Sequence, residues 1–88
     1  MTGEIVGVEL QESARETPWN WCCLITATWE ATEVYAKMRE IDAWCSETLP
    51  KDRWKTSSVV WSRGEFLKTD YYFETQAQAV LFQMRWNP

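Results

Sequence analysis

The stretch Trp21–Trp29 reads WCCLITATW and predicts a strand at the centre of a β-sheet. It is rich in β-branched and aromatic residues, which favour strands. Its residues alternate between two sides, one including Cys23 and Ile25 and the other Cys22 and Leu24, and both sides are mostly apolar. A strand with two apolar sides is typical of the interior of a sheet rather than its edge. We therefore expect the other elements to be arranged around this strand.

Two amphipathic helices are predicted further along the chain. Over Ala31–Leu49, apolar residues recur at the spacing of a helix with one buried face, with Thr32 as the expected N-cap and Pro50 ending the helix. The predicted buried stripe consists of Val34, Met38, Ile41, Cys45 and Leu49. Near the end of the chain, Thr75 is followed by glutamine three positions on, as in a capping box, so a second helix is expected over Gln76–Trp86.

Three further strands complete the predicted elements. Trp54–Ser62 and Phe66–Phe73 flank Arg63-Gly64, where the glycine suits the positive φ of a tight turn. Glu4–Leu10 alternates loosely and also predicts a strand, whereas the polar segment 11–20 is expected to be a loop. Residues 1–18 are therefore either a flexible arm or an edge strand.

The fold expected from these elements is α+β, with the order β-β-α-β-β-α. It predicts an antiparallel four-stranded sheet with two helices on one face, a ferredoxin-like variant that contains a split β-α-β unit. The chain has 88 residues, which is enough for one small domain spanning residues 1–88.

The composition argues against an enzyme. Histidine is absent, which removes the usual general base and the commonest metal ligand. Cys22, Cys23 and Cys45 form no CxxC pair and are expected to be buried free thiols, as in a reducing compartment. The sequence has no glycine-rich phosphate loop. Asp70 and Glu74 come nearest to an acid pair, but we interpret them as ordinary surface charges. We expect no catalytic residues, no metal and no cofactor.

The start of the sequence lacks the basic and apolar regions of a secretion signal. Its longest apolar run, Trp21–Ile25, is too short to cross a membrane. These features predict a cytoplasmic protein with no membrane partner.

Tryptophan is unusually frequent, with seven among the 88 residues. Three of them, Trp29, Trp61 and Trp86, are expected in the core. The others lie near loops or element borders, and with two acids of the first helix they are the candidate partner-binding residues, because aromatic rings dominate interface hot spots and acids suit a basic partner. This candidate set is Trp19, Trp21, Trp44, Trp54, Glu40 and Asp42. A homodimer that covers the excess rings is an alternative.

A second alternative is a single-stranded nucleic-acid-binding module in the hairpin 53–73. The whole chain carries a net charge of −4, yet this hairpin holds an excess of cations interleaved with Trp54, Trp61 and Phe66. Single-strand binders stack bases on rings and pair phosphates with cations. The candidate cations are Arg53, Lys55, Arg63 and Lys68.

The C-terminal run Tyr72–Trp86, YFETQAQAVLFQMRW, resembles the tails of small uncharacterised phage-encoded proteins. Those tails carry an aromatic strand and then a helix of the form A-x-L-F-x-[LM]-R-W. The Trp44-Cys45 pair and Trp54 are similar to them as well. The resemblance implies a phage-type accessory protein in the cytoplasm of a bacterial host, but no mechanism. By analogy of size and source, its partner would be a host or phage protein. The protein would then inhibit a host enzyme or defence complex, or assemble as a virion component.

Overall fold

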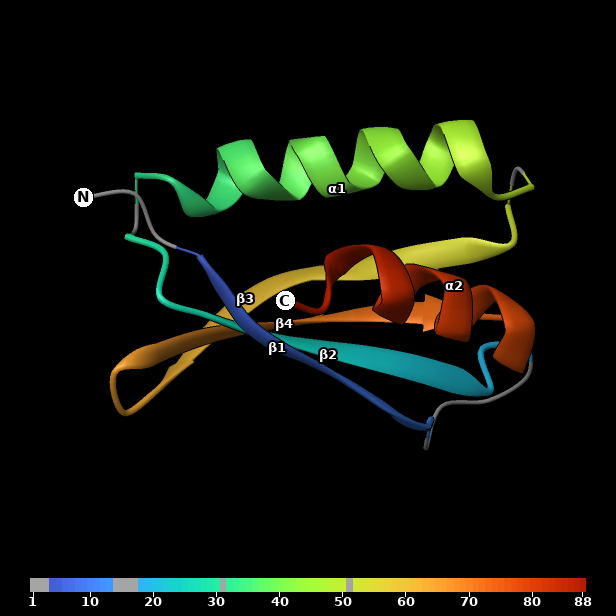
Figure 1. Cartoon of the computed structure of the whole chain (residues 1–88), viewed down its shortest axis with the longest axis horizontal. Helices are drawn as coiled ribbons and strands as arrows, with labels where there is room; N and C mark the ends of the chain where they lie inside the picture. Colours follow the sequence, from blue (N-terminus) through green and yellow to red (C-terminus); the bar gives the residue numbers. More distant parts are fainter. Residues whose placement is uncertain (1–3, 14–17, 31, 51) are drawn as a thin grey trace.

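A computed structural model describes residues 4–13, 18–30, 32–50 and 52–88 (Figure 1). Along the chain its elements are β1 (Ile5–Glu12), β2 (Trp21–Ala27), α1 (Val34–Thr48), β3 (Trp54–Arg63), β4 (Phe66–Phe73) and α2 (Gln76–Trp86). An α+β fold with an antiparallel sheet and two helices is therefore confirmed.

The described strands form one sheet in the order β1-β2-β4-β3, in which all neighbours are antiparallel. As predicted, β2 lies inside the sheet, between β1 and β4. Because β2 and β3 are both antiparallel to β4, they run parallel to each other, and α1 connects them with β4 inserted between. This is a split β-α-β unit, but the chain order differs from the β-α-β-β-α-β order of a ferredoxin-like fold. Here the strand beside β2 at the sheet edge comes first in the chain.

The N-terminal segment contains a paired edge strand. β1 pairs with β2 from Ile5 to Glu12, so it continues past the predicted end at Leu10, and the predicted loop begins later. The register shifts between Ile5 and Gly7. Residues 1–3 and 14–17, which belong to the predicted flexible arm or edge strand 1–18, lie outside the described residues.

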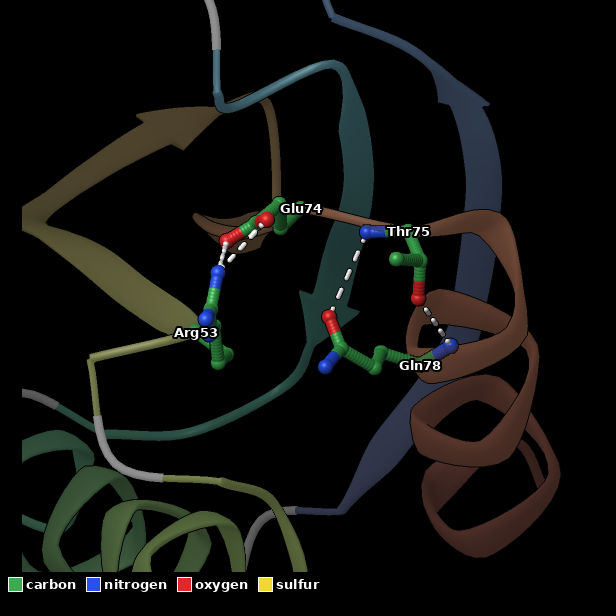
Figure 2. A network of polar contacts seen from close by, with 4 residues as sticks. All are labelled: Arg53, Glu74, Thr75 and Gln78. Carbon is green, nitrogen blue, oxygen red and sulfur yellow. Dashed lines mark hydrogen bonds and ion pairs between the residues drawn. The ribbon is translucent and has the colours of Figure 1, made fainter.

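The helix ends follow the sequence signals to different degrees. In α2 the capping box is present: the Thr75 hydroxyl accepts the Gln78 N–H and the Gln78 side chain accepts the Thr75 N–H, each at 3.3 Å (Figure 2). In α1 the predicted cap Thr32 is wrong. The N-cap residue is Glu33, one position after Thr32, and its N–H donates to the carbonyl of Glu30 in a preceding turn. The helix therefore spans Val34–Thr48 rather than the predicted Ala31–Leu49.

Both helices cover the same face of the sheet (Figure 1). Cys23 and Tyr71 are opposite each other in β2 and β4. The Cys23 thiol donates to the carbonyl of Ala79 in α2, whereas the Tyr71 hydroxyl donates to Asp42 in α1. The predicted stripe of α1 is buried in this core, as are Cys23 and Cys45. Cys22 is buried as well, but on the other face of the sheet. Burial raises the pKa of the Cys23 and Cys45 thiols to about 12, so both are held as neutral thiols.

Candidate functional site

Three tryptophans of the predicted partner-binding set belong to the edge of the core. Trp21 and Trp54 flank Phe73 on the helix-covered face, and both pack against the core. Trp54 also stacks on Tyr71, with ring centroids 6.4 Å apart. Trp44 of α1 meets the rings of Phe82 and Trp86 of α2 edge-on, each at 6.1 Å, and so joins the two helices. The half-burial of these rings therefore has a packing cause.

The two acids of that set have separate roles. Asp42 accepts the Tyr71 hydroxyl at 2.7 Å and is half-buried. Burial raises the pKa of Asp42, and the Tyr71 hydrogen bond opposes this shift. Glu40 is exposed and pairs with Lys37 at 3.1 Å, the kind of surface ion pair that contributes little to stability. The structure does not bring the six predicted residues together on one surface.

The other face of the sheet holds a different group of side chains. Within the described residues, both helices lie on one face, so we call the opposite face of the sheet the open face. Because successive strand residues alternate between faces, the register assigns side chains to it. Its β3 and β4 members are Lys55, Trp61, Arg63, Phe66, Lys68, Asp70 and Tyr72, and its β1 and β2 members are Gly7, Glu9, Gln11, Cys22, Leu24 and Thr26.

On this face, β3 and β4 place a cation opposite an aromatic ring three times. Lys55 is opposite Tyr72, Trp61 is opposite Lys68, and Arg63 is opposite Phe66. Side chains directly opposite in an antiparallel pair have their Cβ atoms about 5 Å apart. Trp61 is 38% exposed, and this overturns its predicted place in the core. These three pairs, which we call the cation–aromatic pairs, form the candidate site.

Neighbouring groups hold parts of this site in place. Lys68 Nζ donates to the Thr26 hydroxyl at 2.8 Å, which fixes the ammonium group above the centre of the sheet. The Tyr72 hydroxyl donates to Asp70 at 3.2 Å. Lys55 Nζ lies 5.8 Å from the centroid of the Trp19 ring, a cation–π contact that brings this half-buried ring to the same end of the site.

Arg53 is the one predicted nucleic-acid-binding cation that the structure directs elsewhere. Its guanidinium donates to both carboxylate oxygens of Glu74 at 2.7 Å and so links the start of β3 to the end of β4 (Figure 2). The hydrogen bond to Glu74 is also the main cause that raises the Arg53 pKa. Its charge is therefore matched inside the protein.

Part of the site could have been found from the sequence. The turn residues are Gly64 and Glu65, so Arg63, predicted as a turn residue, is the last residue of β3. Counting outward from this turn, where Gly64 has φ +65°, pairs Trp61 with Lys68 and thus places it beside the basic residues. The same count fails for Lys55 and Tyr72, because β3 has extra residues between Thr56 and Val60.

Other kinds of site have less support. Among the described residues, no three histidine, cysteine, aspartate or glutamate side chains lie close enough to hold a metal ion. No helix in the described part of the chain is long and apolar enough to cross a membrane.

Comparisons with protein-family models, curated proteins and solved structures gave no match.

Proposed function

We propose that this protein is a non-catalytic module that binds single-stranded nucleic acid on the open face of its sheet. The observation that carries the proposal is the set of three cation–aromatic pairs. A base stacked on an aromatic ring contributes about 1–3 kcal/mol, and a neighbouring lysine or arginine can pair with the adjoining phosphate. Each pair supplies both groups side by side.

The rings and the charges of the open face favour a single strand as the ligand. Unpaired bases can turn outward and stack on rings across a sheet, which the bases of a duplex cannot do. The chain as a whole has a net charge of −4, and α1 on the other face carries two bases, Lys37 and Arg39, against the acids Glu40, Asp42 and Glu47. Attraction to Lys55, Arg63 and Lys68 would direct a polyanion toward the open face.

The test is the affinity for a fluorescent single-stranded oligonucleotide of about 12 nucleotides, measured by anisotropy at low salt. Trp61→Ala is expected to weaken binding roughly 5- to 150-fold, the loss of one stacked base. Tyr35→Ala is the matched control, because Tyr35 is 62% exposed on α1, which covers the other face. Far-ultraviolet circular dichroism would check that both variants are folded. Equal losses in the two variants, or no binding by the unaltered protein at low salt, would contradict the proposal.

A second candidate function is the binding of a host or phage protein, as the resemblance of the C-terminal run implies. The observation that favours it is the exposed Tyr35 ring on a helix whose exposed surface also carries Glu40 and Glu47. This hypothesis includes a phage origin, a cytoplasmic location in the bacterium, and inhibition of a host enzyme or defence complex. Its test is retention of a specific bacterial protein by the immobilised chain. That protein should be lost from Tyr35→Ala and kept by Trp61→Ala, and the reverse pattern would contradict this candidate.

A further inference from the structure

The outer edge of β1 is occupied at one point by two side chains from the C-terminal end of α2, one of them belonging to its C-cap residue. An edge strand presents backbone N–H and C=O groups outward, ready to pair with another strand. At Val8, the N–H donates to Asn87 Oδ1 at 3.0 Å, and the carbonyl accepts from Gln83 Nε2 at 3.0 Å. A residue of a neighbouring antiparallel strand would offer Val8 the same donor and acceptor. The two amides therefore substitute for one residue of a missing strand.

The end of α2 is built to hold these amides together. Gln83 and Asn87 are four positions apart, which places them on the same side of the helix end. Asn87 is the C-cap residue, and its N–H donates to the carbonyl of Gln83 at 2.8 Å. Both side chains line a shallow groove along β1, together with Val6 and Leu10.

We propose that Gln83 and Asn87 are an edge guard that prevents β1 from pairing with β1 of a second copy of this chain. These contacts lie between β1 and the end of α2, so the edge guard is independent of the proposed ligand of the open face. When the guard is removed, the freed Val8 groups are expected to pair with the same groups of the second copy.

The sequence of β1 suits pairing with β1 of a second copy. A two-fold axis at Val8 would place Val8 opposite its own copy, Val6 opposite Leu10 and Gly7 opposite Glu9. Over Val6–Leu10, apolar residues would then face apolar residues, and Glu9 in the middle of the strand would face a glycine rather than a second acid. The same register would place Glu12 opposite Glu4, so the pairing is expected to end before these two acids. Val6, which is 48% exposed, would be covered in such a dimer.

The test compares the solution mass of the unaltered chain with that of Gln83→Ala/Asn87→Ala. Sedimentation velocity over a series of protein concentrations should show a monomer for the unaltered chain and a reversible dimer for the double variant. Gln76→Ala/Met84→Ala is the matched control, because it changes two exposed residues of the same helix and should remain monomeric. Asn87→Ala alone, at the end of α2, should shift the mass in the same direction with a smaller effect and little disturbance of the helix.

Two further measurements assign any dimer to β1. Adding Val6→Lys to the double variant should restore the monomer, because an edge lysine opposes strand pairing. Hydrogen exchange at the Val8 amide should be slow in the unaltered chain, fast in the dilute double variant and slow again when that variant is concentrated. A folded double variant that stays monomeric at every concentration would overturn the proposal. So would a dimer that Val6→Lys leaves intact, or equal self-association of the unaltered chain.

Discussion

Trp61 and Lys68 lie directly opposite each other across β3 and β4, on the open face of the sheet. The ring belongs to one strand and the ammonium group to the other, so their proximity depends on the register of the β3–β4 hairpin. Because Lys68 Nζ is bound to the Thr26 hydroxyl of β2, the cation is fixed relative to three strands. A ligand could contact this ring and this cation together without reorganising the sheet.

The salt dependence of nucleic-acid binding should reflect three cations, Lys55, Arg63 and Lys68. For a single strand, the logarithm of the affinity falls with the logarithm of salt concentration by about 0.7 for each neutralised phosphate, so a slope of about −2 is expected. Lys68→Ala should reduce this slope by about 0.7. Arg53→Ala should leave it unchanged, because Glu74 already matches that charge. Anisotropy titrations at several salt concentrations would measure these slopes, and equal slopes for Lys68→Ala and the unaltered protein would contradict the assignment.

Trp44 should matter for stability rather than for ligand binding. Its ring fills the contact between the helices, against Phe82 and Trp86. Trp44→Ala would leave a cavity there and should lower the free energy of unfolding by about 3 kcal/mol, near the low end of the range for such truncations because the ring is only half-buried. Urea denaturation would measure the loss, and Trp44→Phe should recover part of it. A Trp44→Ala variant with unchanged stability but a lost partner would favour the protein-binding hypothesis instead.

Because of Asp42, we expect the free energy of unfolding to decrease as pH rises. Its pKa is raised in the folded protein by burial, so the folded state binds the proton more readily than the unfolded state. Stability should therefore decrease as pH rises from the unfolded pKa, about 3.9, through the higher folded pKa. Asp42→Asn has no charge to desolvate and retains an oxygen that can accept the Tyr71 hydroxyl, so this part of the pH dependence should disappear.

Urea denaturation at several pH values would measure this change. Glu40→Gln is the matched control, since it removes one negative charge from an exposed position of the same helix. A pH profile that is the same for Asp42→Asn and the unaltered protein would show that the Asp42–Tyr71 contact is not the source.

The capping box of α2 should contribute a measurable part of the free energy of unfolding. Thr75→Ala removes the hydroxyl that accepts the Gln78 N–H and should lower the free energy of unfolding by about 1 kcal/mol (Figure 2). Thr75→Ser keeps the acceptor and should cost only a fraction of that value. Thermal unfolding of the two variants provides the comparison, and similar losses in both would mean that the hydrogen bond is not what stabilises the helix start.

Local features were predicted well from the sequence. The buried stripe of α1 and the bounds of α2 follow from helical spacing and from the Thr75–Gln78 signature, which involve residues a few positions apart. The central position of β2 follows from its two apolar sides. The sheet order could not be predicted in the same way, because it depends on which strands far apart in the sequence pair with each other. β4 pairs with both β2 and β3 and so lies between them.

The candidate site was predicted only in part for the same reason. Lys55, Arg63 and Lys68 were recognised as cations of the hairpin, but Arg53 was grouped with them because its partner Glu74 is 21 residues away. Trp61 was assigned to the core because the face of a strand residue depends on register, and the prediction placed Arg63 in the turn, whereas Arg63 belongs to β3 and pairs with Phe66.

The most direct test of nucleic-acid binding by the open face is a nuclear magnetic resonance titration that follows the indole N–H signals of the seven tryptophans. On addition of a single-stranded oligonucleotide, the Trp61 signal should move strongly, and that of Trp19 beside Lys55 should also move. The signals of Trp29 and Trp86, which are 4% and 7% exposed, should remain in place. Binding that leaves the Trp61 signal unmoved, or an absence of any change at low salt, would contradict the account.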